Sequence, residues 1–338
     1  MQEKEFKIPG FRFAGIHAGI KENPHKFDLG LIVSDLPCSV AGTFTPSRTK
    51  AAPVLIDIEQ IKKGKTQAVL INSGNANACT GKLGLKNARE MVSETAKALG
   101  ISSDHVMISS TGKIGIQLPM DKILPGIRQV ASQLSETAFL DAAKSILTTD
   151  KFLKYHAVRG KIGKIEYTIA GFCKGAGMIE PAMKPASALG QKHATMLGYI
   201  LTDVAISSSV LQSVFTKVVD RTFNCVTVDG DMSTNDTALI LANGKAGNAP
   251  LKAGSKDLKK FEELLEEVSR YLAVKMVEDG EGATKVVELF IKNAKNEKEA
   301  KQAAYAVGRS PLVKTSFFGQ DPNWGRLMAA LGYSGVQF

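Results

Sequence analysis

Short apolar runs alternate along this chain with amphipathic segments. Residues 67–74, 105–112, 198–207 and 237–244 are dominated by apolar residues, and each run ends in a glycine or a polar residue, as buried strands do. Residues 83–99 instead repeat their apolar positions at steps of three and four, which predicts a helix with one buried face. Strands and helices are therefore expected to alternate.

The second half of the chain continues the same pattern. Residues 257–278 give the clearest helical repeat, with a charged face that we expect to be solvated. A hairpin is predicted over 156–171 with its turn at 159–164, then a strand at 286–291 and a helix at 297–307. No repeat or low-complexity linker divides the chain, so the predicted fold class is α/β, with mixed α+β layers.

The composition is that of a soluble globular protein. The chain has 338 residues, of which 44% are hydrophobic and 22% charged. No apolar run approaches the roughly 18–20 residues that span a bilayer, and the charged N-terminus lacks the apolar core of a secretory signal. We expect no membrane partner and a cytoplasmic location.

Basic residues outnumber acidic ones by 43 to 33, for a net charge of +10. They are scattered singly or in pairs such as Lys62–Lys63, without the aromatic interleaving of a nucleic-acid surface. We therefore expect no nucleic-acid partner. A general attraction for small anionic metabolites fits the net charge equally well.

The cysteines and histidines do not predict a metal site or a disulfide framework. Cys38, Cys79, Cys173 and Cys225 lie far apart without a CxxC pair, so we expect reduced thiols in the core. The five histidines show no ligand spacing. No metal is expected.

Three familiar catalytic or nucleotide motifs fail on spacing. Residues 74–82 resemble a Walker loop, but six residues separate the two glycines and Leu83 replaces the required Ser or Thr. Residues 175–180 begin like a dinucleotide fingerprint and then place Glu180 where the third glycine belongs. There is no GxSxG elbow for a serine hydrolase.

Glycine-rich polar blocks instead follow several apolar runs, where α/β enzymes place their chemistry. The blocks are NSGNANACTG (72–81), SSTGKIG (109–115), KGAGMIEPAM with ATML (174–197), TVDGDMSTND (227–236), DGEGATK (279–285) and DPNWGR (321–326). In this order they resemble the ornithine acetyltransferase family, also called glutamate N-acetyltransferase, and the resemblance runs from Gly15 to Gly335.

The resemblance implies a chain that cuts itself before a threonine. The matching bond is Ala194–Thr195, which would give an α segment of residues 1–194 and a β segment of residues 195–338. The freed α-amino group, with a pKa of about 7.7–8.0, can serve as base for the hydroxyl on the same residue. The implied fold is a layered N-terminal-nucleophile type of two intertwined segments, assembled as two α and two β chains.

The resemblance also assigns the other site residues. Thr111 and Gly112 would supply the oxyanion donors. Thr148, Lys174 and Glu281 would contact substrate together with Thr195, with Lys174 suited to a carboxylate and Glu281 to an ammonium group. Thr149 is an equally placed hydroxyl beside Thr148.

The implied reaction is ping-pong acetyl transfer in arginine biosynthesis. N-acetylornithine acetylates Thr195 and leaves as ornithine, and glutamate then takes the acetyl group and leaves as N-acetylglutamate. Some family members also use acetyl-CoA as donor, and these residues do not distinguish the two capabilities. No cofactor is implied.

Two departures from the family keep alternative interpretations open. Residues 184–193 are an insert, so Lys174 precedes Thr195 by 21 positions, ten more than in the family. The sequence stops at Phe338, where the family continues and contributes an asparagine and a C-terminal Ser or Thr, so we expect a truncated C-terminus. An uncut, inactive remnant and an N-terminal-nucleophile hydrolase or aminopeptidase remain the alternatives.

Overall fold

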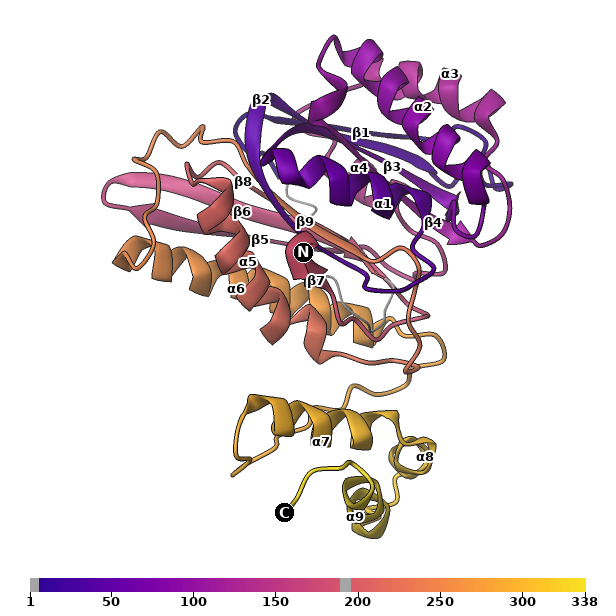
Figure 1. The fold of residues 1–338 in the computed structure, drawn as a ribbon, viewed down its shortest axis with the longest axis vertical. Coiled ribbons are helices and arrows are strands. Elements are labelled where there is room, and N and C mark those ends of the chain that lie inside the picture. The colour runs from indigo at the N-terminus through magenta and orange to yellow at the C-terminus, as the bar shows by residue number, and fades with distance from the viewer. Residues whose placement is uncertain (1–5, 189–195) are drawn as a thin grey trace.

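The computed structural model describes residues 6–188 and 196–338, whose strands join in one mixed sheet (Figure 1). The strand order is β4-β3-β2-β9-β8-β6-β5, with β1 and β7 also paired to β2. The strands are β1 (Phe11–Ile16), β2 (Leu29–Phe44), β3 (Lys65–Asn75), β4 (Val106–Lys113), β5 (Lys154–Ile162), β6 (Ile165–Lys174), β7 (Lys184–Pro185), β8 (Leu197–Thr202) and β9 (Thr237–Ala242).

The long strand β2 belongs to both halves of the sheet. Its first part, from Leu29 to Val33, lies between β1 and β3. The register with β3 shifts between Val33 and Cys38, and from Ser39 to Phe44 the strand pairs with β9. A bulge of this kind bends a strand, and β2 therefore connects two differently oriented halves.

The two halves pack face to face. Alternate residues of a strand point to opposite faces, and one alternate set from each half shares a single buried cluster. Members of this central cluster are Phe11, Phe13, Val69, Ile71, Tyr199, Leu201, Leu239 and Leu241. Phe139 joins the halves, because its ring lies edge-on to Phe13 at 5.3 Å and to Phe172 at 5.2 Å between centroids.

Helices cover the two outer faces (Figure 1). They are α1 (Ala52–Gln60), α2 (Gly81–Leu99) and α3 (Met120–Ser132) in the first half and α5 (Ser208–Arg221) and α6 (Lys256–Glu278) in the second. The short helix α4 (Phe139–Ser145) instead contributes Phe139 and Ala142 to the central cluster. Leu70 and Ile108 pack outward with α1–α3, and Ile200 and Ile240 with α5 and α6. The layers therefore run α, β, β, α, which confirms the predicted mixed α/β class.

The last three helices form a small group beside this body (Figure 1). They are α7 (Glu297–Arg309), α8 (Pro311–Phe318) and α9 (Trp324–Gly332), with a small core of Val307, Val313 and Ala330. Polar contacts attach the group to the body: the Tyr305 hydroxyl donates to the Asn224 carbonyl at 2.9 Å, and Lys314 donates to the Val228 carbonyl at 2.5 Å.

The predicted strand at 286–291 is wrong. That stretch has no ladder partner in the described part of the chain, and Val286, Val287 and Phe290 are 47%, 41% and 74% exposed. An apolar run becomes a strand only when a neighbouring edge accepts its backbone hydrogen bonds. The other predicted strands and helices are present, although the hairpin turn contracts to Gly163 and Lys164.

The cysteines and the insert also refine the sequence picture. Cys38 and Cys173 are buried as predicted, but Cys79 and Cys225 are exposed, because both lie in connections and not within strands. The insert begins as β7, which pairs with Thr43–Phe44 of β2, while 189–193 lie outside the described residues. No helix in the described ranges is long and apolar enough to cross a bilayer.

Asp57 is a buried acid in the first half of the fold. Its Oδ1 accepts a hydrogen bond from the Ile108 backbone at 2.9 Å, and Oδ2 has no hydrogen-bond partner among the described residues. Burial raises the pKa of Asp57 well above its usual range. The folded state therefore keeps a proton that the unfolded chain loses near pH 4, and stability falls as pH rises above that value.

Replacing Asp57 with asparagine should raise the free energy of unfolding at pH 8 by about 1 kcal/mol or more, because the amide needs no proton to remain neutral. The gain should vanish near pH 4, as measured by urea unfolding at both values. Asp121→Asn, at an exposed aspartate, is the control and should change little at either pH. Equal effects of Asp57→Asn at both pH values would contradict the assignment.

Candidate active site

Two parallel strand ends form one wall of the candidate site. β3 and β4 run side by side, with Ser73 opposite Thr111 and Gly74 opposite Gly112. Thr111 is buried, and Gly112 has φ +132°. A Cβ atom on Gly112 would lie 2.3 Å from the Gly74 carbonyl carbon, so only glycine fits there. The Thr-Gly strand end exists as predicted, and its oxyanion role stays a prediction.

Asn235 attaches a second polar block to this wall. Its Nδ2 donates to the Ala76 carbonyl at 2.6 Å and to the Ser110 carbonyl at 2.8 Å. Asn235 is buried and is the second-last residue of the 227–236 block, just before β9. The 227–236 block is identifiable from the sequence. Nothing in the spacing of its residues indicated that the Asn235 amide binds the backbone next to Thr111.

The start of β8 lies between two other elements of the site. Leu197 pairs with Lys174 of β6 on one side and with Thr237 of β9 on the other. The buried Met196 accepts the Thr237 N–H at 2.9 Å. The predicted cleavage residues Ala194 and Thr195 lie outside the described residues, and the chain that follows them enters the sheet here.

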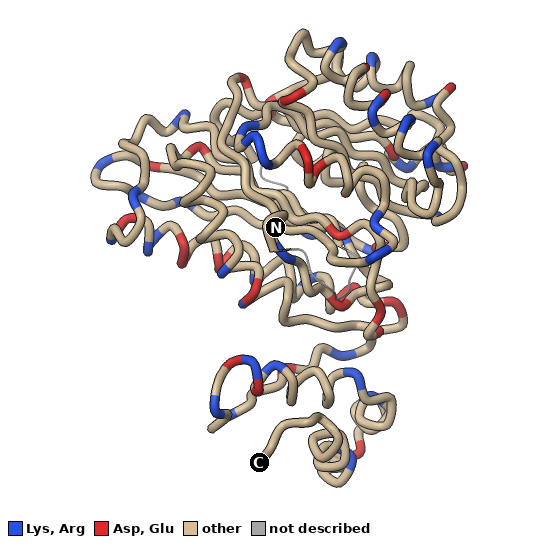
Figure 2. Tube along the Cα trace, viewed as in Figure 1, with Lys and Arg blue, Asp and Glu red and all other residues tan. Residues whose placement is uncertain are grey.

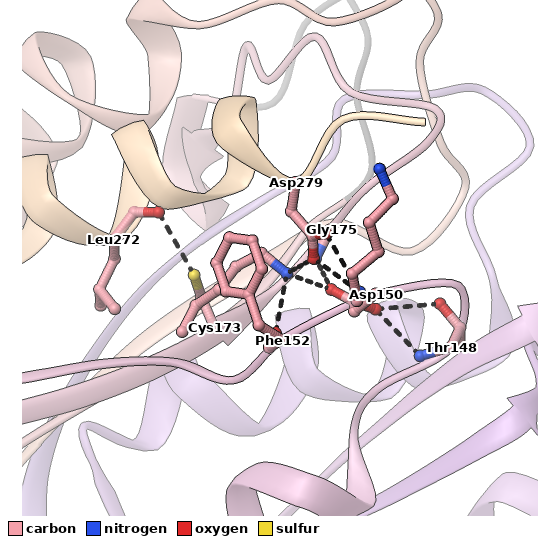
Figure 3. Close-up of polar contacts among 9 residues, drawn as sticks. Thr148, Asp150, Phe152, Cys173, Gly175, Leu272 and Asp279 are labelled. Carbon is pink, nitrogen blue, oxygen red and sulfur yellow. Dashed lines mark hydrogen bonds and ion pairs between the residues drawn. The ribbon is translucent and has the colours of Figure 1, made fainter. Parts of the chain in front are cut away.

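A buried lysine joins three segments near this point. The Lys154 ammonium lies 2.6 Å from Asp150 Oδ1 and also binds Asp279, and all three side chains are fully buried. Asp150 Oδ1 accepts the Gly175 N–H at 2.8 Å, and Asp279 accepts the Lys151 N–H at 3.1 Å. Figure 3 shows Asp150 between Gly175 and Thr148, with Asp279 close by. We call Asp150, Lys154 and Asp279 the buried triad.

Electrostatics fix the charges of this region. Burial alone would raise the pKa of Asp150, but Lys174 and Lys154 outweigh it and lower that pKa to about 2. Lys174 is almost completely buried, and this burial lowers its pKa even though Asp150 opposes the effect. Asp150 therefore remains anionic at physiological pH, next to a lysine that loses its proton more easily than usual.

The structure separates the two candidate threonines. The Thr148 backbone N–H donates to Asp150 Oδ2 at 2.9 Å, and its hydroxyl lies 3.4 Å from the same oxygen. Thr149 is exposed. Thr148 is therefore the residue attached to the buried triad, while its contact with substrate stays a prediction.

Glu281 lies against the turn that follows Lys174. Its backbone N–H donates to the Ala176 carbonyl at 2.8 Å. A Cβ atom on Gly177 would come within 2.7 Å of the Glu281 carboxyl carbon, so the side chain covers this glycine. Glu281 is exposed to solvent and available to a ligand.

Acidic side chains also hold the following residues of the turn. Asp229 accepts the backbone N–H groups of Met178 at 2.7 Å and Ile179 at 2.9 Å. The largely buried Glu180 accepts from the Thr227 hydroxyl at 2.9 Å and from Arg309 Nε at 2.8 Å. In the sequence, Glu180 is notable only as the residue that replaces the third glycine of a dinucleotide fingerprint. In the structure Glu180 connects the site to α7 through Arg309.

Lys and Arg occur throughout the fold, interspersed with Asp and Glu (Figure 2). Within the described ranges, no group of three or more His, Cys, Asp or Glu is arranged to hold a metal ion.

Removing the cation of the buried triad should destabilise the fold strongly. Lys154→Met keeps most of the stem but leaves two buried carboxylates facing each other, which we expect to cost about 3–5 kcal/mol of unfolding free energy. Urea unfolding measures the change, with Lys151→Met as the exposed neighbouring control. Adding Asp279→Asn should recover part of the loss, and a variant as stable as the parent would contradict the buried ion pair.

Comparison with known proteins gives a consistent family. The ArgJ family model matches residues 12–338. Arginine biosynthesis bifunctional protein ArgJ of Geobacter sulfurreducens is 50% identical, covering 97% of this chain and 81% of its own length. The protein of the same name from Caldanaerobacter subterraneus is 47% identical, covering 97% of this chain and 79% of its own.

Two solved structures agree with this. Ornithine acetyltransferase of Mycobacterium tuberculosis, complexed with ornithine, is 37% identical with a TM-score of 0.50, covering 52% of this chain and 94% of its own. The ArgJ protein of Bacillus halodurans is 40% identical with a TM-score of 0.50, covering 52% and 92%. The resemblance found in the glycine-rich blocks is confirmed, and this chain belongs to the ArgJ family, the acetyl-transferring enzymes of arginine biosynthesis.

Proposed function

We propose that this chain cuts itself between Ala194 and Thr195 and then moves the acetyl group of N-acetylornithine to glutamate through an acetyl ester on Thr195. The position of β8 is the observation that carries the proposal. Two residues after Thr195, Leu197 pairs with both Lys174 and Thr237. Asn235, two residues before Thr237, donates to the Ser110 carbonyl beside Thr111.

The nucleophile chemistry follows from the N-terminal threonine. Its hydroxyl attacks the acetyl carbonyl while the α-amino group of the same residue takes the proton. The C–N bond of N-acetylornithine breaks, and the leaving amine receives that proton and departs as ornithine. The amine of glutamate then attacks the ester, the C–O bond breaks, and the hydroxyl regains its proton as N-acetylglutamate leaves.

Both steps pass through an oxyanion. Thr111 and the Gly112 N–H are the donors we assign to it, and such a donor is worth about 10²–10³ in kcat. The rigid strand end supports the assignment, because a donor fixed before the reaction needs no rearrangement. The close backbone approach at Gly112 holds that end in one conformation.

The residues that we assign to substrate binding are Lys174, Glu281 and Thr148. Donor and acceptor share an α-carboxylate, which a cationic Lys174 would bind, and Glu281 would hold the side-chain ammonium of ornithine. Asp150 supports this, because its negative charge opposes the lowering of the Lys174 pKa that burial causes. The buried triad holds the Thr148 loop, the Gly175 turn and Asp279, two residues before Glu281, in fixed relation.

Two further parts of the proposal concern donors and assembly. The relatives are named bifunctional, and we propose acetyl-CoA as a second acetyl donor for this chain. We also propose an assembly of two α and two β chains. The cut itself is supported by the solved relatives, since each matches only 52% of this chain while more than nine-tenths of its own length is covered, as one fragment of a cut protein would be.

Intact mass under denaturing conditions tests maturation. We expect fragments of residues 1–194 and 195–338, whereas Thr195→Ala should remain one chain of 36.1 kDa without N-acetylornithine–glutamate transfer. Transfer by the uncut variant would contradict the nucleophile. A parent protein that stays uncut would favour the inactive remnant, and acetate release without glutamate would favour the hydrolase.

Thr111→Ala should slow both the cut and the transfer about 10²-fold, because it removes one oxyanion donor. A time course of fragment formation and the transfer assay measure the two rates. Ser109→Ala is the matched control, since Ser109 is a buried hydroxyl on β4, two residues before Thr111. Normal maturation of Thr111→Ala would remove this residue from the role.

The lowered pKa of Lys174 predicts a pH-dependent KM. Its charge is lost as pH rises through a pKa below 10.5, so the KM for N-acetylornithine should increase on the alkaline side before ordinary lysines titrate. Lys174→Met should raise KM about 10–100-fold at pH 7. Lys174→Arg, which stays charged, should abolish the alkaline rise, and Lys164→Met should change nothing. A KM independent of pH in the parent would contradict the contact.

A further inference from the structure

A cationic cavity lies beside Gly74, at the end of β3. Its volume is about 490 Å³, and it lies between the 17–22 segment and the 113–122 segment. Its charged lining is Lys21, Lys113 and Lys122 against the single acid Glu22. We call this cavity the basic pocket.

The basic pocket adjoins the candidate active site. Gly74 and Asn75 line it, and Gly112 packs directly on the Gly74 backbone. Burial lowers the pKa of Lys21 to about 8, and the charges of Asp150 and Lys174 are among those that act on it. The pocket therefore borders the strand end that carries Gly112, and Lys21 lies within electrostatic range of Asp150 and Lys174.

Buried hydrogen bonds hold the segment that carries Lys21 in place. The fully buried Asp28 accepts the backbone N–H groups of Ala18, Ile20 and Lys21 at 2.6, 2.8 and 2.9 Å. The Lys21 ammonium donates to the Phe27 and Leu147 carbonyls, both at 2.7 Å. An ammonium has three donors, so one remains for a ligand.

The other two lysines lie on the opposite wall. Lys122 donates to the Gly19 carbonyl at 3.0 Å across the pocket, and Lys113 is exposed. Three ammonium groups against one carboxylate give an excess of two positive charges around one cavity. Such a focus of charge in a concave site attracts a multiply charged anion.

The amino-acid substrates do not account for this excess. N-acetylornithine carries one carboxylate, which the proposal assigns to Lys174, and glutamate adds only one more. A cavity of this volume is in the range that holds an organic ligand, larger than an inorganic ion needs. Lysine is a common partner of phosphate as a point charge.

We propose that the basic pocket binds the phosphate groups of an acyl donor, namely the phosphorylated end of coenzyme A when acetyl-CoA supplies the acetyl group. This rests on the proposed acetyl transfer. Lys113 and Lys122 bind the phosphates, Lys21 adds its remaining donor, and the acyl end extends past Gly74 toward Thr111.

The test measures binding of unacylated coenzyme A, which cannot be turned over, by calorimetry. The variant is Lys113→Ala with Lys122→Ala, and its control is Lys259→Ala with Lys260→Ala on the solvated face of α6. We expect the first pair to weaken coenzyme A about tenfold or more and the control to leave it unchanged. Pantetheine, which lacks the phosphates, should bind the parent and the variant alike.

Steady-state kinetics and a phosphate competition complete the test. The variant should raise the KM for acetyl-CoA and leave the KM for N-acetylornithine and the fragment masses as in the parent. The proposal would be overturned if the variant bound coenzyme A as tightly as the parent, or if both KM values rose equally. It would also be overturned if the pocket bound inorganic phosphate but not coenzyme A. If N-acetylornithine transfer fails while coenzyme A binding still follows the two lysines, the proposed amino-acid reaction is wrong and the pocket assignment stands.

Discussion

The ion pairs of Lys154 with Asp150 and Asp279 are the constraint on which the candidate site depends. In a dry interior each charge is costly to bury alone, so the three groups must meet with good geometry or the fold loses stability. Their meeting fixes the loop of Thr148, the turn after Lys174 and the end of α6 relative to one another. Local hydrogen bonds could not do this, because the three segments are far apart in sequence.

Local patterns predicted what depends on neighbouring residues. The strands near Leu70, Ile108, Ile200 and Ile240 follow from apolar runs ended by glycine or polar residues, and α2 and α6 follow from helical spacing. Gly112 was recognisable too, because a glycine required by close backbone contact lies inside a quoted block. The family resemblance could also be found from the sequence, because it depends on local blocks of residues and on their order.

Long-range pairing was out of reach of the sequence. Lys154 lies in no block, and its partners are 4 and 125 positions away. Asn235 lies in a block, yet its bond to Ser110 spans 125 positions. The apolar run at 286–291 shows the converse, because its pattern is right for a strand while no neighbouring edge accepts it. A side chain's role here is set by what the fold brings to it.

The position of the long strand β2 in the chain affects how the cut protein could refold. It lies before Thr195 in the chain, while its partner β9 lies after it, and Lys154 and Asp279 are divided in the same way. A cut at residue 194 would therefore leave two fragments that share one sheet and one core. Folding of the intact chain is unimolecular, but recovery of the cut protein requires two molecules to meet. The mature enzyme would thus owe its lifetime to the slowness of unfolding, and dilution after unfolding would make the loss permanent.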